Sequence, residues 1–235
     1  MGGNITVEQD KRNSNPAAMA EAAADCDLDR YISIATVPFM PAGSRRQLTA
    51  LILFHHELRR IPHLASEPFL GLIRLQWWRD RLAANDRAGP DFLPDLLDIA
   101  ALNRDGLYDL IDLFSSMLEM PERKGDVDAS VATRAAARLQ RLFAETLGVG
   151  DAGLVRRASA VGAAYSLSLS GDPRDREKAG NYLRRARAGR PPPRTVMAAF
   201  TLARLADHRL AHGVNARPPV SMPFRIMAAC MQRRI

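Results

Sequence analysis

Cysteine is scarce in this chain, and its two cysteines, Cys26 and Cys230, stand near opposite ends. Neither has a partner at a metal-binding spacing, which argues against a disulfide framework and a paired-cysteine zinc site, so we expect two reduced thiols. Glycine-rich phosphate loops and nucleophile elbows are also missing. Charged residues interrupt every apolar run before it reaches the length of a membrane span. We therefore predict a cytoplasmic protein that at most lies peripherally at the inner membrane.

β-Branched residues are sparse as well, whereas alanine, leucine and arginine dominate. Because no long stretch alternates polar and apolar residues, strands are disfavoured and the predicted fold class is all-α. Residues 1–24 are polar and lack the apolar centre of a secretory signal. We interpret residues 1–24 as a disordered N-terminal tail and residues 25–235 as one helical domain.

Positive charge is concentrated at one end of the chain. Residues 178–235 carry one lysine and eleven arginines against the single acid Asp207, a net charge of +11, whereas the whole chain has +7. Such a segment suits a pyrophosphate or anionic lipid headgroups, and we expect it to be the docking surface. A plain compositional bias remains the alternative, because the chain has 30 arginines and 3 lysines. No nucleic-acid-binding motif accompanies the charge, so no specific nucleic acid is expected.

Apolar spacing and caps predict the helices. A short helix capped by Asp27 or Asp29 comes first, followed by a helix that Ser44 caps and Pro62 ends. The stretch 69–84 is apolar on nearly every side, which predicts a central helix packed by neighbours all round. Further helices are expected at 91–101, 104–120, 129–147, 151–170, 173–188, 194–212 and 222–235, with a loop at 122–126.

One stretch carries a specific pattern. A Phe-x-x-Glu-Leu helix is followed by Ser-Glu-x-x-x-Gly-x-x-Arg-x-Gln-Trp-Trp, formed by Phe54, Glu57, Leu58, Ser66, Glu67, Gly71, Arg74, Gln76, Trp77 and Trp78. This pattern resembles the squalene/phytoene synthase family, most closely the branch that includes a mitochondrial complex I assembly factor and its α-proteobacterial relatives. The resemblance implies an isoprenoid-synthase-like helical bundle around a central cavity.

Enzymes of that family join two prenyl diphosphates and neutralise the leaving pyrophosphate with Mg²⁺, which prefers carboxylate ligands. The resemblance places their first motif, Asp-Asp-x-x-Asp, at Arg59-Arg60-Ile61-Pro62-His63, where cationic side chains replace the acids and Pro62 is expected to end the helix. Their second motif falls at 165–175, where Asp172 and Asp175 remain. These two acids are more simply explained as the N-cap and first-turn acid of the next helix.

We accordingly expect no catalytic residue, no bound metal and no cofactor; Mg²⁺ would be needed only if the alternative of an active enzyme holds. Candidates for a remnant diphosphate or isoprenoid pocket are Arg59, Arg60, His63, Glu67, Arg74, Gln76, Trp77 and Asp80. Gln76 and Asp80 are expected to be buried and to share a polar network, and at least one of the two tryptophans should pack in the core. His208 and His212 have the i, i+4 spacing of two metal ligands, although surface or core histidines are the default.

The resemblance implies a catalytically degenerate family member that acts as a binding or assembly factor, like the factor that helps to assemble respiratory complex I. Its partners would be complex I subunits, with a prenyl lipid and an anionic membrane surface as further candidates. The alternative is an active Mg²⁺-dependent head-to-head prenyl diphosphate transferase.

Overall fold

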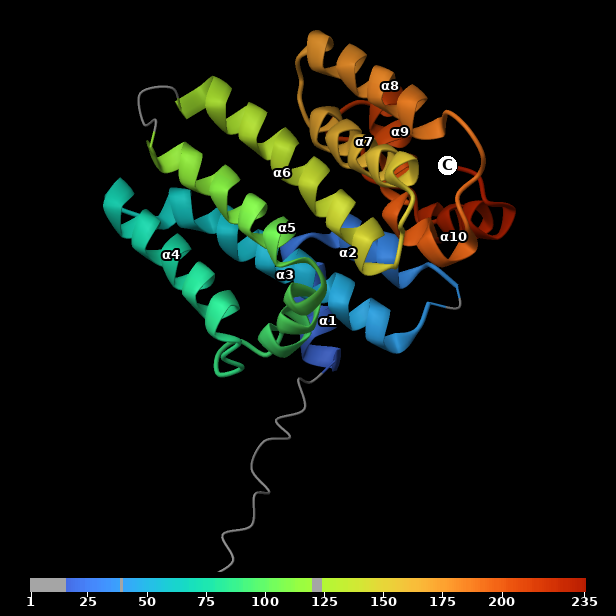
Figure 1. The fold of residues 1–235 in the computed structure, drawn as a ribbon. Helices are drawn as coiled ribbons and strands as arrows, with labels where there is room; N and C mark the ends of the chain where they lie inside the picture. Colours follow the sequence, from blue (N-terminus) through green and yellow to red (C-terminus); the bar gives the residue numbers. More distant parts are fainter. Residues whose placement is uncertain (1–15, 39, 120–123) are drawn as a thin grey trace, which may run out of the picture.

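The computed structural model describes residues 16–38, 40–119 and 124–235. Within these residues the chain is all-helical, as the sequence predicted, and Figure 1 shows helices packed side by side. In chain order they are α1 (Pro16–Cys26), α2 (Leu28–Ala35), α3 (Ala42–Leu64), α4 (Pro68–Ala84), α5 (Leu93–Glu119), α6 (Lys124–Thr146), α7 (Ala152–Ser168), α8 (Pro173–Arg187), a 3₁₀ helix (Arg194–Ala199), α9 (Leu202–His212) and α10 (Met222–Gln232).

The central helix is α3, and the prediction that 69–84 is central is wrong. Every residue from Leu48 to His55 is buried, and α3 contacts α1, α2, α4, α5 and α6. Helix α4 instead lies at one edge of the molecule (Figure 1). Its inner face, with Trp78, packs on α3 and α5, while its outer face exposes apolar side chains such as Phe69. An apolar helix face in the sequence indicates that the face is buried, but it does not show whether the same chain or another molecule buries it.

Several predicted boundaries need correction. Helix α3 begins before Ser44, at Ala42, and Pro62 lies inside it. Pro62 cannot donate a hydrogen bond to the Leu58 carbonyl, and the helix ends two residues later, where the Ala65 N–H donates to the Ile61 carbonyl at 3.0 Å. Helix α6 begins at Lys124, so the end of the predicted loop at 122–126 is helical, while 122 and 123 lie outside the described residues.

The remaining differences concern the chain ends and two helix joints. Residues 16–24 of the predicted tail belong to α1, whose Met19 is buried, and residues 1–15 lie outside the described residues. The helices expected at 91–101 and 104–120 form one element, α5, with a kink at Asn103. The helix expected at 194–212 divides into the 3₁₀ helix and α9. In the described ranges, no helix has both the length and the apolar character needed to cross a membrane.

Helices α6 and α7 pack closely against each other. A Cβ atom built on Gly162 of α7 would lie 2.2 Å from the Ala136 carbonyl oxygen of α6. Gln140, one turn further along α6, is fully buried, and its Nε2 donates to the Ala199 carbonyl at 2.7 Å. Glycine therefore permits the approach of two backbones, and Gln140 ties the same helix to the C-terminal part of the chain.

Candidate functional site

A cavity of about 320 Å³ lies between α2, α3, α5, α6 and α7. One wall is apolar, formed by Phe114, Met117 and Leu169 together with the alanines of α6. The other wall is polar and cationic, with Arg30 from α2 and Arg59 from α3. The cavity thus combines an apolar wall with positively charged groups, which suits a ligand that has an apolar body and an anionic end.

Arg30 is held at the cavity by its own helix terminus. Asp27, the N-cap of α2, accepts the Arg30 backbone N–H at 3.1 Å and forms an ion pair with the Arg30 guanidinium. Burial alone would raise the pKa of Asp27, but the charge and hydrogen bonds of Arg30 outweigh it and lower the pKa. Asp27 is therefore ionised and already neutralised by Arg30. Among the described residues, the buried Nε of Arg30 has no hydrogen-bond partner.

His55 of α3 lines the same cavity as a neutral group. Its ring is buried and meets the Phe114 ring edge-on, with centroids 5.8 Å apart. Burial, assisted by the positive charge of Arg30, lowers the pKa of His55 from 6.5 to about 3. At neutral pH the imidazole is therefore uncharged, and the cationic character of the cavity comes from the arginines.

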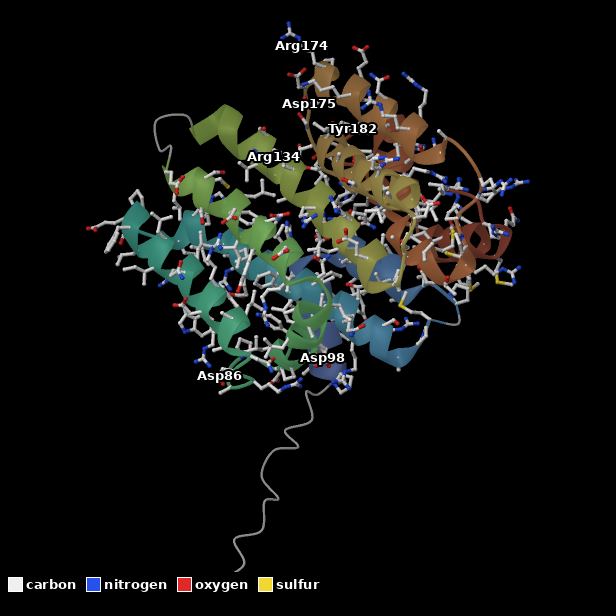
Figure 2. The ribbon with its side chains drawn as sticks, viewed as in Figure 1. Asp86, Asp98, Arg134, Arg174, Asp175 and Tyr182 are labelled. Atoms are coloured by element: carbon white, nitrogen blue, oxygen red, sulfur yellow. The ribbon has the colours of Figure 1, made fainter. Side chains whose placement is uncertain are left out.

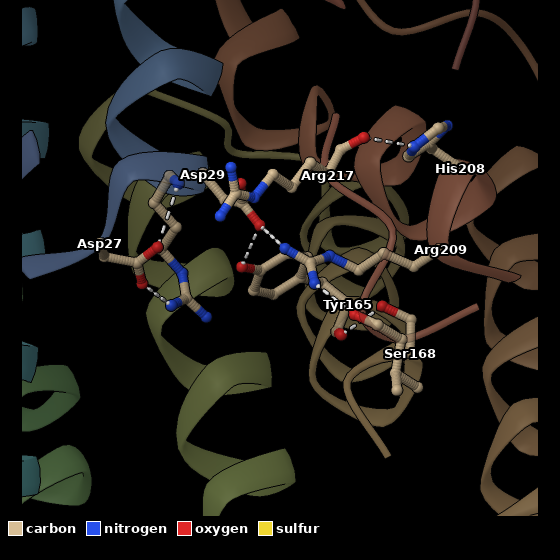
Figure 3. Close-up of polar contacts among 9 residues, drawn as sticks. Asp27, Asp29, Tyr165, Ser168, His208, Arg209 and Arg217 are labelled. Atoms are coloured by element: carbon tan, nitrogen blue, oxygen red, sulfur yellow. Dashed lines mark hydrogen bonds and ion pairs between the residues drawn. The ribbon is translucent and has the colours of Figure 1, made fainter. Parts of the chain in front are cut away.

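A buried polar network joins the start of the chain to α7 and α9 (Figure 3). One carboxylate oxygen of Asp29 accepts the Tyr165 hydroxyl at 2.8 Å and also forms an ion pair with Arg209, 180 residues away. The Tyr165 ring lies between two guanidinium groups, with Arg30 5.1 Å and Arg209 5.9 Å from its centroid. Burial raises the pKa of Tyr165, which keeps its hydroxyl protonated as a donor.

The structure divides the sequence-predicted pocket candidates into two sets. Arg59 and His63, at the place of the first family motif, line the cavity. The other candidates are exposed and do not line it: Arg60, Glu67, Arg74, Gln76, Trp77 and Asp80. Arg60 forms an ion pair with Glu57 at 3.3 Å.

The expected buried network on α4 is wrong, because α4 lies at the edge of the bundle. Gln76 donates to Asp80 at 2.7 Å, but both side chains are exposed. The expectation for the tryptophans is confirmed: Trp78 is 5% exposed and packs in the core, while Trp77 is 40% exposed.

The second motif segment also reaches the cavity, but its acids do not. Tyr165 and Ser166 of α7 line the cavity opposite α3. Asp172 accepts the Arg174 N–H at 2.8 Å as the N-cap of α8, and Asp175 pairs with Lys178 at 3.2 Å. Figure 2 places Asp175 near the outer end of α8. The interpretation of these acids as cap and first-turn acid is thus confirmed.

The residues described at this cavity do not fit a Mg²⁺–diphosphate clamp. Mg²⁺ requires several oxygen ligands, whereas the one carboxylate lining the cavity, Asp27, is paired with Arg30. Across the described part of the chain, no group of three or more His, Cys, Asp or Glu side chains could hold a metal ion. The rings of His208 and His212 stack 4.5 Å apart, and each hydrogen-bonds a backbone carbonyl.

The sequence did not reveal several polar contacts in and beside the cavity. Asp27 and Asp29 were noticed as possible caps, but their partners Arg30, Tyr165 and Arg209 carry no local signal. A cap motif indicates only where a helix starts, so the contact between Asp29 and Arg209 could not be read from either segment alone.

Comparison with known proteins adds one finding. The family model described as squalene/phytoene synthase matches residues 31–168, more than half of the chain, from α2 to the end of α7. This stretch includes Arg59, His63 and Tyr165 of the cavity, while Asp27 and Arg30 precede it. No curated protein and no solved structure matches the chain.

Proposed function

Because the chain belongs to the squalene/phytoene synthase family, we propose that it is a catalytically degenerate member that works by binding, as an assembly factor for respiratory complex I. The main support for a loss of catalysis is the positive charge of the cavity lining. Where a family enzyme would gather carboxylates around Mg²⁺, this cavity presents the guanidinium groups of Arg30 and Arg59. Arg59 makes no ion pair with the described residues and would repel a divalent metal, while Arg30 already holds the one carboxylate of the lining, and neither guanidinium can supply oxygen ligands.

The same cavity supports binding of a prenyl lipid with a phosphate end. Arg59 makes no ion pair with the described residues, and Arg30 lines the same cavity. Guanidinium groups bind phosphate oxygens directly, so no metal is required. The apolar wall at Phe114, Met117 and Leu169 would hold the hydrocarbon chain.

We expect the full-length protein to bind farnesyl diphosphate in the presence of EDTA and to leave it uncleaved when Mg²⁺ is added. Arg59→Gln should weaken binding by roughly tenfold, because a charge-assisted hydrogen bond is lost. Arg60→Gln is the matched control, since the adjacent arginine pairs with Glu57 and does not line the cavity. Calorimetry measures binding, and chromatography detects products. Mg²⁺-dependent release of pyrophosphate with a coupled product would establish the alternative, an active head-to-head transferase.

The outer face of α4 supports the assembly role. Phe69, Leu70, Ile73 and Trp77 form an exposed apolar stripe there, next to exposed Leu64 at the end of α3. Charges of both signs border it, including Glu67 and Arg74. Large aromatic side chains within a mixed polar rim are typical of protein interfaces, whereas an anionic membrane would favour a rim of one sign. We therefore propose that this face binds the protein partner.

Phe69→Asp is expected to abolish co-purification of complex I subunits from the native host, because it places a charge within the apolar stripe. Phe69 is 67% exposed, so the folded monomer should keep its circular dichroism and melting temperature. Leu102→Asp on α5 is the control, since Leu102 is 77% exposed and belongs to neither the α4 stripe nor the cavity lining. If Phe69→Asp recovered the subunits as well as the wild type, α4 would not be the interface. If the wild-type protein recovered no complex I subunits, the assembly role would be refuted.

A further inference from the structure

Helix α10 carries a second exposed apolar stripe. Phe224, Met227 and Met231 follow one another at spacings of three and four residues, which places them on one side of the helix, and Val220, just before the helix, is 93% exposed. The opposite side of α10 is buried through Met222, Ile226, Ala229 and Cys230. The helix is therefore fixed to the domain and presents a continuous apolar edge to the outside.

A groove of about 380 Å³ lies beside this stripe, between α9 and α10. Arg204 of α9 and Arg225 of α10 line it, and neither guanidinium makes a hydrogen bond or an ion pair with the described residues. The one acid in the lining, Asp207, is occupied by an ion pair with Arg187. The groove therefore offers two arginines without an anionic partner next to apolar side chains.

The charge of the surrounding segment has the same sign. Between residues 178 and 235 the chain has one acid, Asp207, and twelve basic side chains. Arg217, Arg233 and Arg234 flank the ends of α10 and are exposed. A surface of one sign with an apolar ridge differs from the mixed-charge rim of α4, and it complements an anionic bilayer.

We propose that α10 is a membrane-surface helix, with its apolar stripe inserted among the acyl chains of an anionic bilayer and a lipid headgroup phosphate bound by Arg204 and Arg225 in the α9–α10 groove. The stripe supplies hydrophobic burial, and the groove supplies preference for anionic lipid. This site is separate from the cavity at Arg59 and from α4, which lies on the other side of the molecule (Figure 1). The protein would thus bind the membrane at α10 while α4 stays accessible.

Flotation of the full-length protein with vesicles tests the proposal. We expect binding to vesicles of phosphatidylcholine mixed with phosphatidylglycerol, little binding to phosphatidylcholine alone, and weaker binding as salt rises above about 0.1 M. Phe224→Asp should lower the partition coefficient by about tenfold. The substitution replaces an apolar side chain with a carboxylate, which the anionic lipid headgroups repel. Arg225→Gln should lower it by about fivefold.

Arg174→Gln is the matched control for charge, because this exposed arginine lies at the outer end of α8, away from α10 (Figure 2). It should change the partition coefficient by less than about twofold. Equal flotation with neutral and anionic vesicles, or equal losses for Arg174→Gln and Arg225→Gln, would overturn the headgroup site. Binding of inorganic phosphate without any vesicle binding would assign the groove to a free anion and refute the membrane helix.

Discussion

Replacing Asp29 with asparagine is expected to lower the free energy of unfolding by about 3–5 kcal/mol, because it leaves the buried Arg209 guanidinium without its counter-charge. The two side chains of this pair are 11% and 14% exposed, so solvent screens them weakly. The asparagine oxygen can still accept the Tyr165 hydroxyl, so the loss reports mainly on charge. Urea denaturation followed by circular dichroism measures it.

Asp98→Asn is the control for the same chemical change at the surface. Asp98 pairs with Arg87 at 2.8 Å, and about half of each side chain is exposed. Its loss should cost less than about 1 kcal/mol. Adding Arg209→Gln to Asp29→Asn should recover part of the stability, since the unpaired charge is then removed. Equal losses for the two single variants would show that the Asp29–Arg209 pair is not electrostatically special.

Gly162→Ala is expected to destabilise the protein by about 2 kcal/mol, although alanine is the better helix former. The new methyl group would meet the Ala136 carbonyl oxygen at 2.2 Å and Gln140 Cβ at 2.8 Å, so α6 and α7 must separate. Overpacking of this kind costs about 3 kcal/mol, and the helix propensity of alanine returns about 1 kcal/mol. Gly162→Val should cost more because it adds volume at the same contact. Thermal and urea unfolding measure both effects.

Gly180→Ala provides a control of opposite sign. Gly180 lies within α8, and a Cβ there would meet nothing within 4 Å. The substitution should therefore stabilise the protein by about 0.5 kcal/mol or more. If both glycine variants changed stability in the same direction, the close approach of α6 and α7 would not be the reason for glycine at 162. Because α6 and α7 both line the cavity, Gly162→Ala should also weaken farnesyl diphosphate binding, whereas Gly180→Ala should not.

Local sequence signals predicted the helices well where a cap and an apolar pattern agreed. Asp27 and Asp172 each cap a helix as expected, and Asp151 caps α7, because a side-chain oxygen and the next N–H groups lie within a few residues of one another. The prediction that Pro62 ends the helix failed, because α3 continues for two residues beyond it, to Leu64. The spacing of apolar residues also could not place α4 at the edge of the bundle. An apolar helix face gives the same sequence pattern whether the same chain or a partner molecule covers it.

The sequence by itself determined the all-helical class, several capped helix starts and the membership of the squalene/phytoene synthase family. Those properties depend on neighbours within a few turns or on a linear pattern. Only the tertiary structure decided that Arg59, Arg30 and Tyr165 line one cavity, that Asp29 meets Arg209, and that α4 and α10 present their apolar stripes outward. These are contacts between distant segments, and they follow from how the helices pack.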